Sequence, residues 1–192
     1  MGMRLFHLSA LAGLLVATGS VQREHIHEKR CAAVDPRNLI AYFEMFLAEP
    51  SYSAEDAMQV LGDKEEFDVL GIELNPKLPE VESAHLKLLE NPPTRRPQSL
   101  KAFLCGVSLD FFRDRGPRIS FVELTRKFGE PQELPLPPPR LLPGQPYRPD
   151  YTYAFDAKGK VFRGSLMLTV DGKRSGDLNR VIRVSYRRYS RN

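Results

Sequence analysis

The apolar residues after position 34 follow the period of an amphipathic helix, which we expect over 36–48. Asp35 followed by Pro36 favours this start, because Asp can cap free backbone amides and Pro fits the first helical position. Pro50 follows the expected end of the helix. The apolar residues that share one face are Leu39, Ile40, Phe43, Phe46 and Leu47.

A second, short helix is predicted soon afterwards. Ser53 and Asp56 have the spacing of a capping box, in which each side chain accepts a hydrogen bond from the other residue's backbone amide. Gly62 then supplies a residue that can adopt the left-handed conformation at the end of the helix. Two strands are predicted next, over 67–74 and 81–89. In the second strand, the apolar residues Ala84, Leu86 and Leu88 alternate with Ser83, His85 and Lys87.

The second half repeats this order of elements. Apolar residues at helical spacing predict a helix over 99–113, and Ser120 with Glu123 forms a second capping-box pattern. The block 117–130 aligns without a gap on 50–63, with a proline, a serine and a glycine in common. The apolar residues of the predicted helix are Leu100, Phe103, Leu104, Val107 and Phe111.

The strands predicted in the second half complete this comparison. A turn at 155–158 followed by a strand over 161–170 corresponds to the turn at 74–77 followed by the strand over 81–89. A final strand over 181–189 has no counterpart in the first half. We therefore expect an α+β fold, with antiparallel sheet covered on one face by helices and a tandem duplication of a helix–helix–strands unit. The alternative is chance reuse of favourable capping residues.

Prolines mark the expected boundaries. The proline-containing segment 91–97 separates a first α+β unit, 35–97, from a second, 98–192. Within the second unit, residues 131–149 contain eight prolines. Such a segment cannot pair as a central strand, so we interpret it as a stiff spacer or surface strap. A ligand for an aromatic groove is the alternative.

The first twenty residues have the layout of a secretory signal peptide. Arg4 precedes an apolar run from Leu8 to Ala17, and small residues follow. The run is shorter than the roughly 20 residues that a membrane-spanning helix needs. We expect cleavage of 1–20, a tail over 21–34, and export to the periplasm or the exterior; an uncleaved signal anchor is the alternative.

Charge is distributed unevenly along the chain. The net charge is +4, but residues 35–100 carry 6 basic against 13 acidic side chains, whereas residues 101–192 carry 18 against 9. The basic C-terminal end could contact lipid headgroups, polyanionic glycans or an acidic protein, and the alternative is a solvated strand face. Nucleic acid is not an expected partner of an exported chain that lacks an aromatic and basic motif. The arginines of this end are Arg180, Arg183, Arg187, Arg188 and Arg191.

The chain has two cysteines, Cys31 and Cys105. Because export leads to an oxidising compartment, we expect them to form a disulfide. The alternative is a buried free thiol at Cys105, which lies in an apolar run where a cysteine can behave as a small hydrophobic residue.

Residues that could carry chemistry are few. His25 and His27 have the spacing of metal ligands, but they lie in the expected tail, so we predict no metal site and no cofactor. His85 and Cys105 could form a nucleophilic dyad only if the fold joined them, and a histidine on the polar phase of a strand is usually a surface residue. We predict no catalytic residue. A cell-wall hydrolase with an unmarked carboxylate pair remains an alternative.

The block Ser53–Asp63 and the block Ile119–Pro131, which reads ISFVELTRKFGEP, resemble the exported BamE-like fold. In that fold a short helix ends in a Leu-Gly or Phe-Gly step before an antiparallel sheet. Two such units in one chain are similar to the arrangement in the β-lactamase inhibitor protein family. The resemblance covers about a third of the expected mature residues; it lacks the usual glycine before the helix and does not include the proline-rich insertion. It implies an α+β binding scaffold without catalytic residues.

These observations predict an exported protein that works by protein–protein contact, as an inhibitor or immunity-type protein of an envelope or secreted enzyme. The alternative from another class is an envelope structural or assembly factor that contacts lipid or cell wall. No small-molecule ligand is indicated. Tyr and Arg are enriched among interface anchors, and ordinary strand packing is the alternative role for each candidate. The candidates are Tyr147, Tyr151, Tyr153, Arg183, Tyr186, Arg187 and Tyr189.

Overall fold

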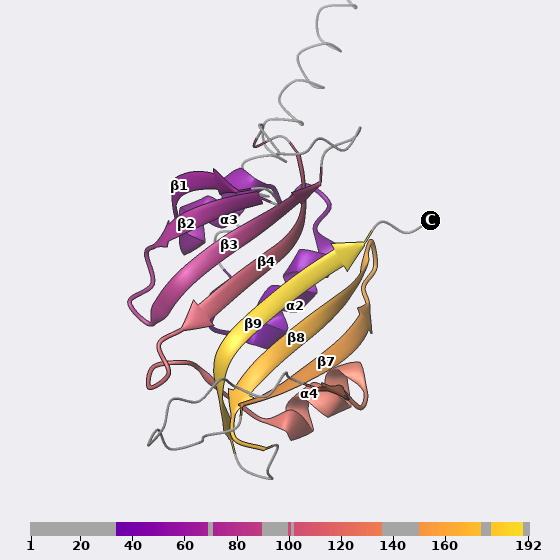
Figure 1. Ribbon diagram of the computed structural model, residues 1–192. Coiled ribbons are helices and arrows are strands. Elements are labelled where there is room, and N and C mark those ends of the chain that lie inside the picture. The colour runs from indigo at the N-terminus through magenta and orange to yellow at the C-terminus, as the bar shows by residue number, and fades with distance from the viewer. Residues whose placement is uncertain are drawn as a thin grey trace, which may run out of the picture.

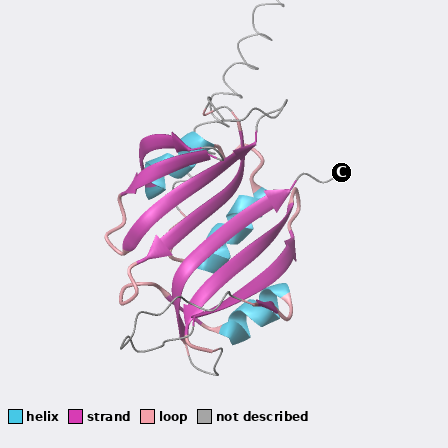
Figure 2. Ribbon diagram, viewed as in Figure 1, coloured by secondary structure: helices cyan, strands magenta, loops and turns pink. Residues whose placement is uncertain are grey.

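A computed structural model describes residues 34–68, 71–89, 100, 102–135, 150–173 and 178–189. These residues form an antiparallel sheet of nine strands and three helices, so the expected α+β class is confirmed (Figure 2). The helices are α2 (Leu39–Ala48), α3 (Ala54–Leu61) and α4 (Phe121–Phe128). The strands are β1 (Gly62–Asp68), β2 (Gly71–Pro76), β3 (Val81–Leu89), β4 (Phe103–Phe111), β5 (Arg118–Ile119), β6 (Gln132–Leu134), β7 (Asp150–Lys158), β8 (Arg163–Asp171) and β9 (Asn179–Tyr189).

Strands that follow one another in the chain pair with one another in both halves of the sheet. The spatial order is β1-β2-β3-β4-β9-β8-β7-β6, and the short β5 pairs with the start of β9. The two halves meet where β4 lies beside β9 (Figure 1). Five register pairs form this seam, from Gly106 opposite Arg187 to Asp110 opposite Arg183.

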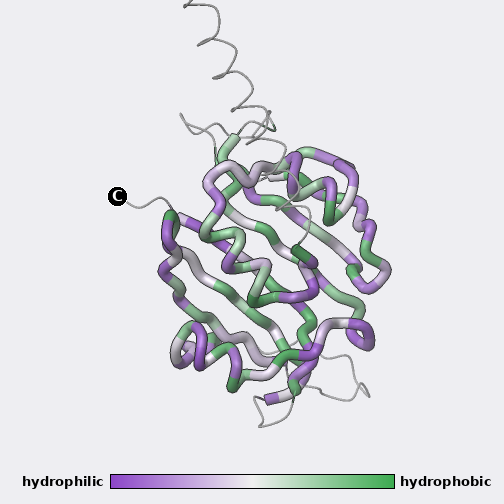
Figure 3. Tube along the Cα trace, turned by 180° about the vertical axis from the view of Figure 1, so that it is seen from behind, coloured by the Kyte–Doolittle hydropathy of each residue, from purple (hydrophilic) through white to green (hydrophobic). Residues whose placement is uncertain are grey.

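The strands bury alternate side chains against the helices. α2 contacts β8 and β9, α3 contacts β1, β2 and β3, and α4 contacts β7. Apolar segments of helix and strand meet in this layer (Figure 3). Aromatic rings fill much of it: Tyr186 of β9 lies 5.0 Å from Tyr42 of α2 between ring centroids, and Phe121 of α4 lies 4.8 Å from Tyr153 of β7. The helices therefore bury their apolar faces on strands from both halves of the sheet.

The predicted helix over 99–113 is wrong, because residues 103–111 form strand β4. Val107, Leu109 and Phe111 are buried at alternate positions, and a register shift in the pairing with β3 brings Leu104 into the core as well. β4 is hydrogen-bonded to β3 on one side and β9 on the other. At Gly106 an added Cβ would lie only 3.2 Å from atoms of both neighbouring strands, so glycine suits this crowded central position.

The start of the first helix also differs from the prediction. α2 begins at Leu39, and the side chain of Asn38 caps it by accepting a hydrogen bond from the amide of Ala41 at 3.2 Å. Asp35 instead accepts a hydrogen bond from the amide of Arg37 at 2.9 Å. The Asp35 carboxylate also pairs with the guanidinium of the same arginine. It therefore stabilises the turn that precedes the helix.

The two predicted capping boxes have different outcomes. At α3 the box is present: Ser53 accepts from the amide of Asp56, and the Asp56 carboxylate accepts from the amide of Ser53. At α4, Ser120 occupies the cap position but makes no side-chain cap hydrogen bond, so the predicted box with Glu123 is wrong. A serine is the N-cap residue of both helices, yet only the cap of α3 is stabilised by side-chain hydrogen bonds.

The glycine after α3 has a role other than the predicted left-handed one. Gly62 is extended, with φ of 163°, and an added Cβ would lie 2.2 Å from the carbonyl oxygen of Asn75 on β2. Glycine is needed there because two backbones approach closely. The strand predicted over 67–74 is in fact the end of β1 and most of β2, which pair as a hairpin.

One charged side chain lies within this core, that of Arg188 on β9, which is 1% exposed. Its Nε donates to the carbonyl oxygen of Leu104 at 2.7 Å, beyond the last backbone pair of the β4–β9 seam. Its Nη1 donates to the carbonyls of Phe46 and Glu49 at 3.2 and 2.9 Å. Its Nη2 donates to that of Tyr52 at 2.7 Å. One guanidinium thus joins β4, β9, the end of α2 and the connection to α3.

Aromatic rings enclose the same guanidinium. Its Cζ lies 4.5, 4.9 and 4.8 Å from the ring centroids of Phe46, Phe103 and Phe162, which is within the range of cation–π attraction. Burial lowers the pKa of Arg188 to about 10, so the group stays charged at neutral pH. The carbonyls at the end of α2 carry the negative end of the helix dipole and favour this charge.

We predict that Arg188→Met destabilises the protein by about 3 to 5 kcal/mol, because three buried carbonyl acceptors and one part-buried acceptor lose their donor. The neighbouring Arg187 is exposed, so Arg187→Met should change stability by less than about 0.5 kcal/mol. Urea unfolding followed by circular dichroism measures both. Equal effects of the two substitutions would contradict this role of Arg188.

The two helix-starting serines provide a second matched comparison. Ser53→Ala removes the side-chain acceptor of a complete capping box and should cost about 1 kcal/mol. Ser120→Ala removes no cap hydrogen bond and should stay within about 0.5 kcal/mol of the parent protein. Both free energies of unfolding come from the same denaturant titration, and the prediction fails if Ser120→Ala is the more costly change.

Candidate functional site

On each strand, the described side chains that alternate with the buried core residues lie on the other side of the sheet, and we call this side the open face. Adjacent residues in register point to the same side of a sheet, so the pairing identifies the side chains that share this face. One such row crosses eight strands from β1 to β6. In the order of the strands it contains Glu66, Glu73, His85, Ser108, Ser185, Met167, Ala154 and Gln132.

Small residues form the centre of the open face. Ser108 and Ser185 face each other across the seam, with their Oγ atoms 2.8 Å apart. Gly106, one pair further along, and Ala154 on β7 add no long side chains. A partner surface can therefore approach the backbone of the sheet closely at its centre.

Charges of both signs lie on the open face. Glu66 and Glu73 on β1 and β2 are exposed acidic residues. The basic side chains follow β3, β9, β8 and β7. They are Lys87, Arg187, Arg163 and Lys158. Exposed Asp156 on β7 lies in the same register row as Arg187, so basic and acidic side chains are interspersed on this part of the face.

The seam is also the position of an ion pair. Arg183 on β9 pairs with the Asp110 carboxylate on β4, which raises the pKa of the Arg183 guanidinium. Ser83 on β3 donates its hydroxyl to the same carboxylate at 3.0 Å. With Arg183 paired and Arg188 buried, the arginines predicted as one basic end do not form a single patch, and Arg191 lies outside the described residues.

Three of the predicted binding residues lie on the open face. Arg183, Arg187 and Tyr189 all belong to β9, and Tyr189 is 50% exposed. Their separation by two or four positions corresponds to one side of a strand. The three predicted residues therefore share one side of β9, although Arg183 also forms the ion pair with Asp110 across the seam.

The other predicted binding residues have different positions. Tyr153 and Tyr186 are buried in the core, where the rings stack on Phe121 and Tyr42, so neither is at the surface. Tyr151 packs partly buried against the core. Packing, the alternative weighed for each of them, accounts for these three positions. Tyr147 lies outside the described residues.

A cavity of about 420 Å³ opens where β3 and β9 end and β4 begins. Its apolar lining is formed by Leu89, Phe103, Phe162 and Tyr189. Lys87, Arg187, Arg188 and Cys105 complete the lining. We call it the β3–β4–β9 cavity. Sequence reasoning missed it, because its walls come from three strands and the turn before β8.

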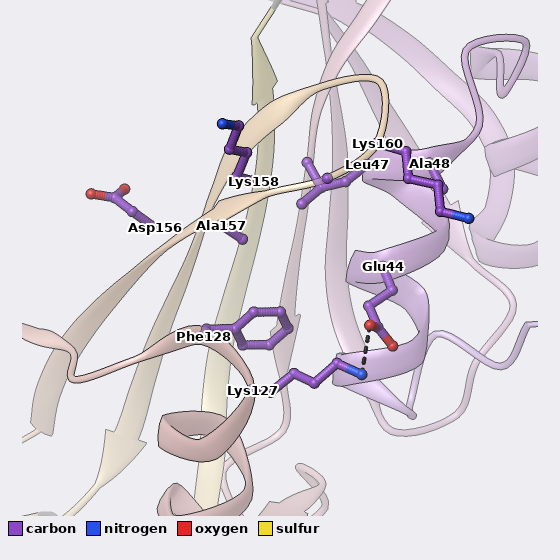
Figure 4. Close-up of a pocket in the computed structure, with 10 residues that line it drawn as sticks. Glu44, Leu47, Ala48, Lys127, Phe128, Asp156, Ala157, Lys158 and Lys160 are labelled. Atoms are coloured by element: carbon purple, nitrogen blue, oxygen red, sulfur yellow. Dashed lines mark ion pairs between the residues drawn. The ribbon is translucent and has the colours of Figure 1, made fainter.

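A second cavity, of about 490 Å³, lies between α2, α4 and the turn from β7 to β8 (Figure 4). Lys127 Nζ of α4 pairs with Glu44 Oε1 of α2 at 2.7 Å beside it. Asp156 and Lys158 extend away from the ring of Phe128. Because its charges are of both signs and its lysine and glutamate hold two helices together, this cavity is a structural junction.

Cys105 carries a free thiol, and Cys31 lies outside the described residues, so the disulfide remains a prediction. The Cys105 Sγ donates to the carbonyl of Lys87 at 3.4 Å, and burial raises the pKa of the thiol. His85, the other member of the dyad considered above, is in register with Ser108.

The described part of the chain contains no group of three or more His, Cys, Asp or Glu side chains that could hold a metal ion. His25 and His27 lie outside it. No helix in the described ranges is sufficiently long and apolar to cross a membrane. Comparison with protein families, with curated proteins and with solved structures found no match.

The raised pKa of Cys105 predicts slow reaction of its thiol near neutral pH, because only the thiolate is strongly nucleophilic. In a Cys31→Ser protein, the rate of alkylation by iodoacetamide should rise with pH through a midpoint above that of the same chain unfolded in urea. Mass spectrometry measures both rates. A folded midpoint at or below the unfolded one would contradict the burial of this thiol.

Proposed function

We propose that this chain is an exported, non-catalytic binding protein that recognises a protein partner through the open face of its sheet. The observation that carries the proposal is the row of side chains that runs in register across eight strands, with small residues at its centre. A broad, regular surface of this kind suits a flat protein interface, in which a few central anchors supply most of the affinity.

One-sided cover by the helices is part of the proposal. Each helix packs on the face that carries the buried residues, and the strands are seen in front of the helices from one side (Figure 1) and behind them from the other (Figure 3). Among the described residues, such an arrangement leaves the open face available while the core stays closed. The described open-face residues of β9 then become the central anchors, since β9 lies in the middle of the sheet.

We propose further that the sheet arose by tandem duplication, in a form that differs from the predicted helix–helix–strands unit. A short helix ending at a glycine precedes four consecutive strands twice: α3 before β1 to β4, and α4 before β6 to β9, with β5 outside the scheme. The fourth strands, β4 and β9, pair with each other. This order is consistent with the expected resemblance to tandem inhibitor scaffolds, in which two units together present one surface.

The charged side chains of the open face would orient a partner. Glu66 and Glu73 lie near the β1 edge, whereas Arg187 and Arg163 lie beyond the seam, with Asp156 between them and the β6 edge. Complementary charge on a partner would fix its direction and accelerate association. An exported enzyme blocked by such a face is the form of the proposal that we favour, as an inhibitor or immunity-type interaction.

Met167, half-buried on the open face of β8, tests the proposal. Met167→Arg is expected to lower recovery of a co-purifying protein about tenfold or more, because an unpaired charge buried at an interface costs several kcal/mol. Val122 on α4 is 56% exposed, and Val122→Arg is the matched control that should retain the partner. Quantitative mass spectrometry of the captured proteins from the source cells gives the readout.

Two outcomes would contradict the proposal: no protein recovered reproducibly, or equal recovery with Met167→Arg. Recovery of membrane or cell-wall material that survives Met167→Arg but is lost in high salt would instead support the envelope assembly alternative. The basic residues Lys87, Arg163 and Arg187 on one part of the open face are the observation that favours that alternative.

A further inference from the structure

We propose that the β3–β4–β9 cavity binds a small amphiphile made of a carboxylate and an apolar chain. This ligand site is additional to the protein partner proposed above, and it uses the end of the sheet beyond the β4–β9 backbone pairs. The cavity has apolar walls and lining charges of one sign.

The walls are suited to an apolar chain. The rings of Phe103 and Phe162 lie with centroids 5.6 Å apart, and Phe162 is 9% exposed, so they form a fixed aromatic wall. Leu89 and Tyr189 stand at the surface with 55% and 50% exposure. The volume of about 420 Å³ falls within the range of small-molecule sites, roughly 300 to 1,000 Å³. An apolar chain here would cover hydrophobic surface that is now exposed to water.

The charges that line the cavity are of one sign. Lys87 on β3 and Arg187 on β9 lie on either side of Gly106 of β4, and Arg188 lies behind the aromatic wall. Among the described residues, none of those lining this cavity is acidic. All four hydrogen bonds that Arg188 donates go to neutral backbone carbonyls. Its positive charge therefore has no described carboxylate to offset it, and its field acts through an apolar, low-dielectric region.

An apolar site with uncompensated positive charge favours an anion over a neutral or cationic ligand. A carboxylate can accept hydrogen bonds from both an ammonium and a guanidinium, which Lys87 and Arg187 supply from the two strands that flank Gly106 of β4. A bare inorganic anion would leave the four apolar residues uncovered. The chemistry that matches both features is therefore a chain-bearing carboxylate, of which a free fatty acid is the simplest example.

Decanoate, used below its micelle concentration, is the probe for this site, and Cys105 reports its occupancy. Because the Cys105 thiol lines the cavity, bound decanoate should slow its alkylation by iodoacetamide about tenfold at saturation. The experiment uses the full chain carrying Cys31→Ser. Decanol, which has a chain of the same length without the charge, should protect at least about tenfold less at equal concentration.

Lys87→Gln and Arg187→Gln are each expected to raise the half-protecting decanoate concentration about tenfold, because each removes one charge-assisted contact. Leu89→Glu should abolish protection by placing an anion at the mouth of the cavity. Val122→Glu introduces the same group at an equally exposed site elsewhere and should leave protection unchanged. Thermal unfolding of each variant establishes that it is folded, and Lys87→Gln still tests the idea if Leu89→Glu does not fold.

Three results would overturn the proposal: no protection by decanoate, equal protection by decanoate and decanol, or equal protection in the Leu89→Glu and Val122→Glu proteins. Protection by an acetylated peptide rich in Glu and Phe, but not by decanoate, would likewise replace the small ligand with a segment of a protein partner.

Discussion

A single buried guanidinium joins the parts of this fold. Arg188 contacts backbone carbonyls of β4, of the end of α2 and of the connection to α3, while it extends from β9 itself. Backbone pairing between β4 and β9 stops at Gly106, and the arginine continues the connection beyond that point. Because its partners are carbonyls, it provides directional contacts without a buried carboxylate. Cation–π attraction to three aromatic rings offsets part of the free-energy cost of burying the Arg188 charge in an apolar core.

Much of the local structure could be predicted, whereas structure that depends on remote neighbours could not. β3 was predicted with its observed bounds, and the Ser53 cap was identified from spacing, since both follow from a few adjacent residues. β4 was mistaken for a helix because Leu104, Val107 and Phe111 have helical spacing, whereas in the strand a register shift opposite β3 puts Leu104 out of phase with the other two; pairing with β3 and β9 determines the structure. The burial of Arg188 could not be predicted from residue type either. Residue type suggests that both Arg187 and Arg188 are exposed, yet Arg188 is buried.

The candidate surface was predictable only in part for the same reason. Alternation along β9 is enough to group Arg187 with Tyr189 on one face. It also assigns Tyr186 to the opposite face, a signal that residue type alone, which favours tyrosine as an anchor, had overridden. The β3–β4–β9 cavity required Leu89, Phe103 and Phe162 to meet from separate segments. No pattern within a single segment encodes that meeting.

The shortness of the seam has a thermodynamic consequence. The β4–β9 seam has five register pairs, and the described side chains that join it on the open face include Ser108 with Ser185 and Arg183 with Asp110. The paired residues are more than seventy positions apart in the chain, so closing the seam costs entropy that local hairpins do not. A binder that spans both halves selects the closed sheet and stabilises it by mass action. Occupancy and the joining of the halves are therefore energetically coupled.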